Sequence, residues 1–250
     1  MPSNLNPRQL AAVRHLDGPC LVLAGAGSGK TRVITHKIAY LIQECSIDPR
    51  HIAAVTFTNK AAREMKERVA SLLDKNAAKG LRVSTFHTLG LDIIRRELKT
   101  LGYKPGFSIY DNTDSTGLLR ELMTRAFGDH GNQAEQMLWR ISRWKNAFIL
   151  PEQALSEAAG DAVTVAAARL YEAYNHHLTT YNAVDFDDLI MLPVLLFRQH
   201  PEIMERWQNR IRYLLVDEYQ DTNATQYELV QQLVGVRGNL TVVGDDDQSI

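Results

Sequence analysis

The chain has 250 residues, a mass of 28.2 kDa and a formal net charge of −1. Apolar residues make up 45% of it and charged residues 23%, an ordinary globular composition that excludes a disordered chain, a collagen and a coiled-coil rod. The longest apolar run, residues 190–197, is well short of the ~20 residues that a membrane-spanning helix needs.

The composition also indicates a cellular compartment. Residues 1–9 show no basic start followed by an apolar segment, so no secretory signal is predicted. The two cysteines, Cys20 and Cys45, are too few for the disulfide framework of a secreted domain. We therefore expect a cytoplasmic protein that does not associate with a membrane.

Positive and negative charges are unevenly distributed along the chain. Residues 30–104 carry a net charge of +8, whereas residues 105–250 carry −10. A basic segment of this kind can attract a polyanion such as a nucleic acid. A chance excess of charges on solvated helix faces gives the same pattern, so charge alone leaves both interpretations open.

Strands and helices are predicted to alternate in the first part of the chain. The pair Asn6-Pro7 is typical of a helix start, with asparagine as N-cap and proline at the first helical position. Strands are expected at 20–24, 52–57 and 81–85, with helices at 29–44 and 59–73. Because the strands are continuous apolar runs, we expect a parallel sheet covered on both faces, which is the doubly wound α/β class.

The middle of the chain has a different pattern. From about residue 88 to residue 208 it is almost continuously helical, with one weak strand at 107–110. Long helices are predicted at 161–181 and 185–197, the second bent or broken at Pro193. Two more strands follow, at 213–216 and 240–243. A helical block between strands of one sheet predicts an insertion into a single α/β domain.

A glycine-rich segment is the first chemical motif. It follows a predicted strand and opens a predicted helix, and it reads Ala24-Gly25-Ala26-Gly27-Ser28-Gly29-Lys30-Thr31. Its backbone N–H groups suit a triphosphate, the Lys30 ammonium suits the β- and γ-phosphates, and the Thr31 hydroxyl suits Mg²⁺. Ala24 stands where the motif usually has glycine. A glycine-rich turn with an incidental lysine is the simpler alternative.

Acidic residues follow two of the later strands. Asp217 can hold Mg²⁺ through water, and Glu218 can accept a proton from an attacking water. We expect both beside the phosphate loop, because ligands bind at the carboxyl ends of strands in open α/β sheets. A solvated acidic turn is the alternative. The last strand ends in 244–248, where Gln248 could sense a γ-phosphate, and we interpret most of its aspartates as loop residues.

Seven sequence blocks occur in a fixed order across essentially the whole chain. They are Leu5-Asn6-Pro7 with Gln9, the AGAGSGKTR segment ending at Arg32, and residues 55–65, 84–87, 185–189, 216–222 and 243–250. In this order they resemble the N-terminal portion of superfamily 1 DNA helicases of the UvrD/Rep group. One block alone could be accidental, whereas seven in order are specific.

The resemblance implies a P-loop, RecA-like motor domain made of residues 1–87 and 201–250, truncated at its end, with an inserted helical DNA-binding subdomain at 88–200. It implies an ATP-dependent DNA helicase and translocase, with ATP and Mg²⁺ as cofactors. Its partners would be single-stranded DNA and duplex junctions, and it would be a monomer. By the same resemblance, Gln9 would contact the adenine edge, Arg32 the adenine ring and Gln248 the γ-phosphate.

DNA contacts are implied as well, at Phe57, Thr58, Asn59, Thr85, Phe86, His87, Tyr181 and Phe186. An aromatic side chain that stacks on a base contributes about 1–3 kcal/mol and tolerates any sequence. Core packing is the alternative for Phe57, Phe86 and Phe186, and His87 without the resemblance would be a structural histidine.

In this family a second RecA-like domain supplies arginines that face the γ-phosphate, and we expect it to be absent here. The chain would then be a fragment that binds ATP and single-stranded DNA, hydrolyses ATP poorly and does not unwind a duplex. Two other functions stay open. A P-loop kinase would transfer the phosphate to an acceptor, and a non-catalytic nucleic-acid-binding module would bind single strands with or without nucleotide.

Overall fold

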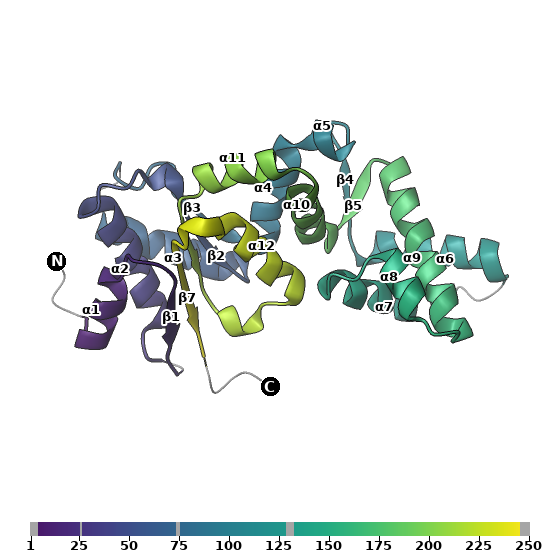
Figure 1. Ribbon diagram of the computed structural model, residues 1–250, viewed down its shortest axis with the longest axis horizontal. Helices are drawn as coiled ribbons and strands as arrows, with labels where there is room; N and C mark the ends of the chain where they lie inside the picture. Colours follow the sequence, from purple (N-terminus) through teal and green to yellow (C-terminus); the bar gives the residue numbers. More distant parts are fainter. Residues whose placement is uncertain (1–4, 26, 74–75, 129–132, 246–250) are drawn as a thin grey trace. The chain divides into compact units, whose positions relative to one another are not determined.

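The computed structural model describes residues 5–25, 27–73, 76–128 and 133–245, and they form two compact units (Figure 1). The first unit comprises Met1–Leu89, Phe197–Thr222 and Tyr227–Ile250. The second comprises Gly90–Leu196 and Asn223–Gln226. Each unit has its own core of apolar side chains.

The first unit contains both helices and strands. Its elements are α1 (Pro7–Arg14), β1 (Cys20–Leu23), α2 (Lys30–Gln43), η1 (Pro49–His51), β2 (Ile52–Thr56), α3 (Asn59–Leu72), β3 (Arg82–Thr85), α11 (Pro201–Arg210), β6 (Tyr213–Val216), η3 (Tyr219–Asp221), η4 (Gly235–Arg237) and β7 (Leu240–Gly244). Three helices contain residues of both units, namely α4 (Phe86–Arg96), α10 (Asp188–Gln199) and α12 (Ala224–Val234).

The five strands of the first unit form one sheet with the order β1-β7-β6-β2-β3, and every pairing is parallel. Leu23 of β1 pairs with Gly244 of β7, and Val55 of β2 pairs with Val216 of β6. Parallel strands that pair in register end at the same edge of the sheet, so the segments that follow them are neighbours. The predicted α/β class with a parallel sheet is confirmed.

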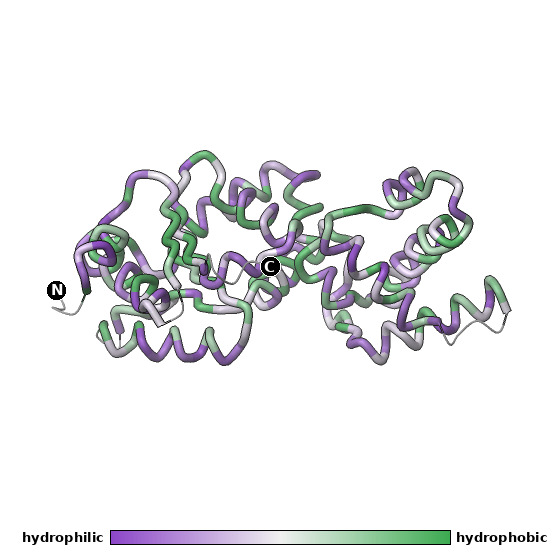
Figure 2. Tube along the Cα trace, turned by 90° about the horizontal axis from the view of Figure 1, so that it is seen from below, coloured by the Kyte–Doolittle hydropathy of each residue, from purple (hydrophilic) through white to green (hydrophobic). Residues whose placement is uncertain are grey.

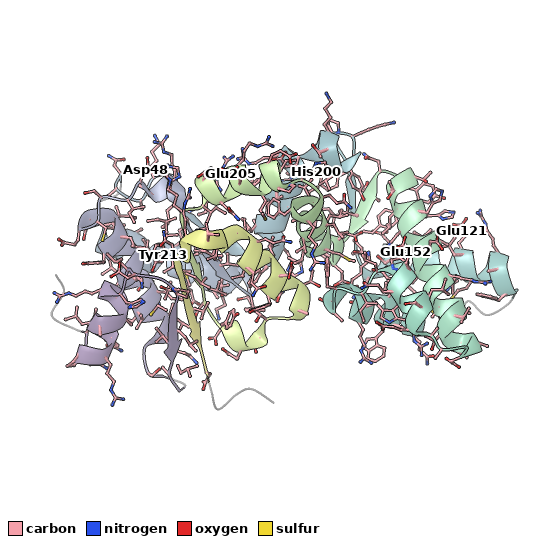
Figure 3. The ribbon with its side chains drawn as sticks, in the orientation of Figure 1. Asp48, Glu121, Glu152, His200, Glu205 and Tyr213 are labelled. Carbon is pink, nitrogen blue, oxygen red and sulfur yellow. The ribbon has the colours of Figure 1, made fainter. Side chains whose placement is uncertain are left out.

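One face of the sheet is packed against α2 and α3. Ile34, Ile38 and Leu41 of α2 and Met65 of α3 are fully buried in this core. The strands stand out as hydrophobic segments in Figure 2. Tyr213, labelled in Figure 3, lies on β6, and its hydroxyl is 3.1 Å from that of Thr241 on β7. Continuous apolar runs therefore do mark the central strands, as the sequence predicts.

β1 differs from the prediction that both faces of the sheet are covered. Leu21 is 59% exposed and Leu23 is 54% exposed, whereas Val22 packs on the core. Successive side chains of a strand point to opposite faces, and β1 is an edge strand. Only the face that carries Val22 is covered by the core, so an apolar run is not enough to identify a strand buried on both faces.

A buried lysine joins α1 to α2. Lys37 donates hydrogen bonds from Nζ to the carbonyl oxygens of Ala12, at 3.0 Å, and His15, at 2.6 Å. These carbonyls end α1, where a helix leaves its last acceptors without intrahelical donors. Burial lowers the pKa of Lys37 to about 8, although nearby Cys20 and Cys45 oppose this shift. Lys37 therefore stabilises the position of α1 at the expense of desolvating an ammonium group.

The second unit is mostly helical. Its remaining elements are α5 (Leu98–Leu101), β4 (Ser108–Tyr110), α6 (Asn112–Phe127), α7 (Ala134–Asn146), α8 (Pro151–Glu157), α9 (Ala162–Thr180) and β5 (Ala183–Asp185). α9 matches the predicted helix at 161–181. Its core gathers buried side chains from α6, α7 and α9, including Leu119, Ile141 and Tyr171.

The prediction of a helix at 185–197 was wrong at its beginning. Residues 183–185 form β5, which pairs in parallel with β4, and α10 starts only at Asp188. The helix continues through Pro193 to Gln199. A strand of three residues is too short to show a period of two, so β5 could not be recognised from its own sequence. Its partner β4 lies more than 70 residues earlier in the chain.

We expect Gly90→Ala to destabilise the second unit. A Cβ atom at Gly90 on α4 would lie 1.8 Å from the carbonyl oxygen of Leu189 on α10, and backbone atoms cannot yield as a flexible side chain can. The free energy of unfolding should fall by about 1–3 kcal/mol or more, measured by urea denaturation. Gly117→Ala on α6 is the matched control, because nothing lies within 4 Å of its Cβ position. It should raise stability by about 0.5–1 kcal/mol. Equal effects at both positions would contradict the close approach.

The Lys37 contact predicts a dependence of stability on pH. Its pKa of about 8 in the folded chain lies below the ordinary value of 10.5, so the unfolded chain binds more protons at this residue between those values. Stability relative to Lys37→Met should therefore rise with pH from about 8 to 10, measured by urea denaturation at several pH values. Lys79→Met, at an exposed position, gives the baseline. A stability difference that does not change with pH would argue against a desolvated ammonium.

Candidate functional site

The loop between β1 and α2 turns through two glycines in the left-handed region of backbone space. The φ angle is +76° at Gly27 and +88° at Gly29, and residues that have a Cβ atom rarely adopt such positive values. Gly29 is the N-cap of α2, and the helix begins at Lys30. The helix N-terminus thus opens directly on the loop, as an anion-binding site requires. Ala26 lies outside the described residues.

Gln9 lies against this loop. Its side-chain oxygen accepts a hydrogen bond from the Asn6 N–H at 3.0 Å, as part of the capping box that starts α1. Its Nε2 donates to the Ser28 carbonyl at 2.9 Å. A Cβ at Gly29 would lie 2.9 Å from that nitrogen, so a side chain at this position would displace the Gln9 amide. Arg32 is exposed on the first turn of α2.

The two predicted carboxylates follow β6. Asp217 is buried, and its N–H donates to the Val55 carbonyl at 2.9 Å, which extends the pairing with β2. Glu218 has a φ angle of +52°, an unusual conformation for a residue with a side chain. The chain therefore turns sharply between the two carboxylates, and the Glu218 side chain remains 39% exposed.

Lys30 joins the glycine loop to the carboxylates. Its Nζ is 3.9 Å from Glu218 Oε2 and 2.9 Å from Asp245 Oδ2. Burial, and then the neighbouring Glu218, raise the pKa of Asp217 to about 6, while Lys30 and a hydrogen bond with the Thr31 side chain oppose the shift. The two motifs that the sequence places 187 residues apart thus meet at one edge of the sheet.

Two residues of this cluster were missed by sequence reasoning. Asp245 was grouped with loop aspartates, yet its side chain is 1% exposed and pairs with Lys30. Gln220 donates from Nε2 to Glu218 Oε2 at 2.7 Å and accepts from the Asp245 N–H at 3.0 Å. The adjacency of β1 and β7 is the signal that would have found Asp245, but strand order is not written in the sequence. Gln248 lies outside the described residues, as do Asp246 and Asp247.

The oxygen donors beside Lys30 suit Mg²⁺. The Thr31 hydroxyl and the Asp217 carboxylate are hard oxygen donors, and the Thr31 side chain opposes the rise that burial causes in the pKa of Asp217. Across the ranges that the structure describes, no group of three or more His, Cys, Asp and Glu side chains could hold a metal ion. A Mg²⁺ ion at this edge would therefore need phosphate oxygens or water to complete its coordination.

The predicted DNA contacts in the first unit lie just after β2 and β3. Phe57 is half-buried, and its ring meets that of Phe86 edge-on at 5.5 Å. Phe86 is 2% exposed and Thr85 6% exposed, so both side chains belong to the core. Thr58 caps α3 by accepting a hydrogen bond from the Ala61 N–H. Two further predicted contacts are not fully buried, namely Asn59 and His87.

The predicted DNA contacts in the second unit are more exposed. Tyr181, at the end of α9, and Phe186, between β5 and α10, are each 49% exposed. Tyr181 lines a cavity of about 690 Å³ together with the acidic residues Asp114 and Glu121. Because its side chain is about half exposed, Phe186 does not have the fully packed position of a core aromatic residue.

Two further observations concern the cysteines and the hydrophobicity of the helices. Cys20 and Cys45 are both unbonded thiols. In the part of the chain that is described, no helix has the length and apolar character needed to cross a membrane.

Comparison with known proteins shows extensive similarity. A family described as "UvrD/REP helicase N-terminal domain" matches residues 5–250. The ATP-dependent DNA helicase Rep of Escherichia coli K12 is 58% identical over 98% of this chain and 36% of its own length, and Rep of Salmonella typhimurium gives the same values. The ATP-dependent DNA helicase PcrA of Leuconostoc citreum is 45% identical over 100% of this chain and 33% of its own length.

The chain thus spans about a third of the length of these curated relatives. The family match covers nearly the whole chain and includes both motifs that meet at Lys30. This chain belongs to the UvrD/REP helicase N-terminal domain family.

Proposed function

We propose that this chain is the ATP-binding and DNA-binding part of an ATP-dependent DNA helicase. The observation that carries the proposal is the approach of Lys30 to Glu218 and Asp245 at the carboxyl edge of a parallel sheet. Thr31 and Asp217 are their neighbours in the sequence. Relatives that share about half of its residues are named ATP-dependent DNA helicases. Its cofactors would be ATP and Mg²⁺, and its substrates single-stranded DNA and duplex junctions.

Nucleotide binding would use the loop that ends at Lys30. Backbone N–H groups of residues 25 and 27–29 and the N-terminus of α2 suit the phosphates, because each contributes partial positive charge. Lys30 pairs with Asp245 in this structure, and a triphosphate carries more negative charge than one carboxylate. We therefore propose that Lys30 exchanges Asp245 for phosphate oxygens when ATP binds. Gln9 and Arg32 would hold the base.

Hydrolysis would depend on the two carboxylates. Mg²⁺, when bound, would polarise the phosphate oxygens, and Thr31 and Asp217 are the residues that would hold it. Glu218 is partly exposed and can accept a proton from an attacking water. Gln220 orients the Glu218 carboxylate by donating to it. Gln248 would contact the γ-phosphate, as the family resemblance implies.

Single-stranded DNA would bind through aromatic side chains. Phe57, Tyr181 and Phe186 each have exposed surface that could stack on a base. The buried Phe86 contacts the Phe57 ring edge-on. Phe86 would therefore affect DNA binding only through the position of the Phe57 ring. The polar residues Thr58, Asn59 and His87 would contact the backbone of the strand, and the buried Thr85 would position them.

Efficient turnover would need a second motor domain in addition to these residues. The Rep relatives are nearly three times as long as the aligned segment. An arginine contributed across a cleft changes the rate of related NTPases by about 10³–10⁵. We also propose a cytoplasmic, monomeric protein, since two unbonded thiols fit a reducing compartment.

A steady-state assay of phosphate release tests the function directly. We expect this chain to bind ATP·Mg²⁺ and to release little phosphate with or without single-stranded DNA. Strong DNA-stimulated turnover by the 250 residues would refute the need for a second domain. Transfer of the phosphate to an acceptor would indicate a kinase. An affinity for DNA that is the same with and without nucleotide would indicate a non-catalytic module.

Lys30→Ala and Glu218→Gln should separate binding from hydrolysis. Lys30→Ala removes the ammonium that contacts the phosphates, so the affinity for a fluorescent ATP analogue should be lost. Glu218→Gln keeps the shape of the side chain and removes its basicity, so nucleotide affinity should persist while phosphate release falls by about 10²–10⁴-fold in the intact helicase. Unchanged ATP affinity of the Lys30 variant would remove the phosphate loop from the mechanism.

Phe186→Ala should weaken the binding of single-stranded DNA. Loss of one stacked base corresponds to about a 5- to 150-fold increase in the dissociation constant, measured by fluorescence anisotropy with a labelled oligothymidylate. Trp139→Ala is the matched control, because Trp139 is a 62% exposed aromatic of the same unit that is not a predicted contact. Equal losses for the two variants would show that Phe186 has no special part in DNA binding.

A further inference from the structure

The last turn of α7 holds a fully buried lysine between two carboxylates. Lys145 Nζ donates to Asp185 Oδ2 and to Asp188 Oδ1, each at 2.7 Å. Tyr174 donates from its hydroxyl to the same oxygen of Asp185 at 3.0 Å. A buried ammonium with this set of partners is held firmly, because any displacement would leave charges unpaired in the core.

Asp185 and Asp188 also stabilise the tight turn that carries Phe186. The Asp188 N–H donates to Asp185 Oδ1 at 2.8 Å, and the Asp185 N–H donates to Asp188 Oδ2 at 3.2 Å. These reciprocal bonds close a short loop around residues 186 and 187. Lys145 therefore anchors the two carboxylates that close the turn on which the half-exposed Phe186 lies.

Asn146, the next residue of α7, joins that turn to another segment. Its Nδ2 donates to Asp187 Oδ1 at 3.0 Å, and its Oδ1 accepts a hydrogen bond from Asn223 Nδ2. Thr225 adds a second connection by donating from its hydroxyl to the Lys145 carbonyl at 2.6 Å. Both ends of the Asn146 amide are thus used, one toward the Phe186 turn and one toward residues 223–226.

Asn223 is close in sequence to the proposed catalytic carboxylate. Residues 219–222 separate it from Glu218, and they form a tight turn in which the Asp221 N–H donates to the Glu218 carbonyl and the Thr222 N–H donates to the Tyr219 carbonyl. In a short hydrogen-bonded segment the distance between the two ends can change only a little. A shift of Asn223 would therefore be passed along the chain toward Glu218.

We propose that Asn146 and Asn223 are positioning residues that couple the binding of single-stranded DNA at Phe186 to the nucleotide site at Glu218. The coupling follows covalent bonds from Glu218 to Asn223 and hydrogen bonds from Asn223 through Asn146 to the Phe186 turn. The inference rests on the proposed function. Because coupling between two ligands is reciprocal, nucleotide must change DNA affinity by the same factor as DNA changes nucleotide affinity.

Asn223→Asp is the variant that tests the coupling. Asn223 Oδ1 accepts from the Gln226 N–H at 2.8 Å as the cap of α12, and aspartate retains that oxygen. Aspartate replaces the Nδ2 donor with an oxygen that faces the acceptor of Asn146, so only the bridge is broken. Asn146→Ala breaks the bridge from the other side. Asn112→Asp, at an exposed position of α6, is the control for the added charge.

The measurement is the affinity for a labelled oligothymidylate with and without a non-hydrolysable ATP analogue and Mg²⁺. In the native chain the two dissociation constants should differ by about 5- to 150-fold. The ratio should fall to about one in Asn223→Asp and in Asn146→Ala, and stay native in Asn112→Asp, while both bridge variants still bind the analogue. Unfolding midpoints verify that each variant is folded.

Two kinds of result overturn the inference, and they are distinguishable. If the native chain binds neither the analogue nor DNA, the proposed function fails and this inference fails with it. If both ligands bind and the native ratio is already one, or the ratio persists in both bridge variants, the proposed function stands and the coupling through Asn146 and Asn223 is refuted.

Discussion

The position of one ammonium group organises the proposed nucleotide site. Lys30 is 10% exposed and lies between Asp245, which is buried, and Glu218, which is partly exposed. Buried carboxylates are costly unless a cation or hydrogen-bond donors balance them, and Lys30 supplies a cation to Asp245. The parallel alignment of β1, β7 and β6 is what allows residues from three distant segments to share it.

The second unit uses the same combination of charges for a different purpose. Lys145 also lies between two aspartates, Asp185 and Asp188, but its side chain is fully buried. Lys30 directly follows the glycine loop and is 10% exposed. A lysine between carboxylates is therefore a fully buried support in one unit, whereas in the other it is the contact that we propose to exchange for phosphate.

Hydrogen bonds from asparagine and glutamine side chains connect these charged centres to their surroundings. Gln220 links Glu218 to the backbone of Asp245, and Asn146 links the Phe186 turn to Asn223. An amide donates at one end and accepts at the other, so it can bridge a carboxylate and a second group at once. Such bridges have directional geometry, so each one fixes the relative orientation of the two groups that it joins.

The sequence by itself determined the parallel α/β class, the central strands, the glycine loop and the acidic strand end, because each rests on local spacing and residue type. Only the tertiary structure decided that Asp245 reaches Lys30, that β5 pairs with β4, that Phe86 is buried and that one face of β1 is exposed. Those features depend on strand order and on which faces are covered. Both are set by contacts between residues far apart in the chain, where no local pattern records them.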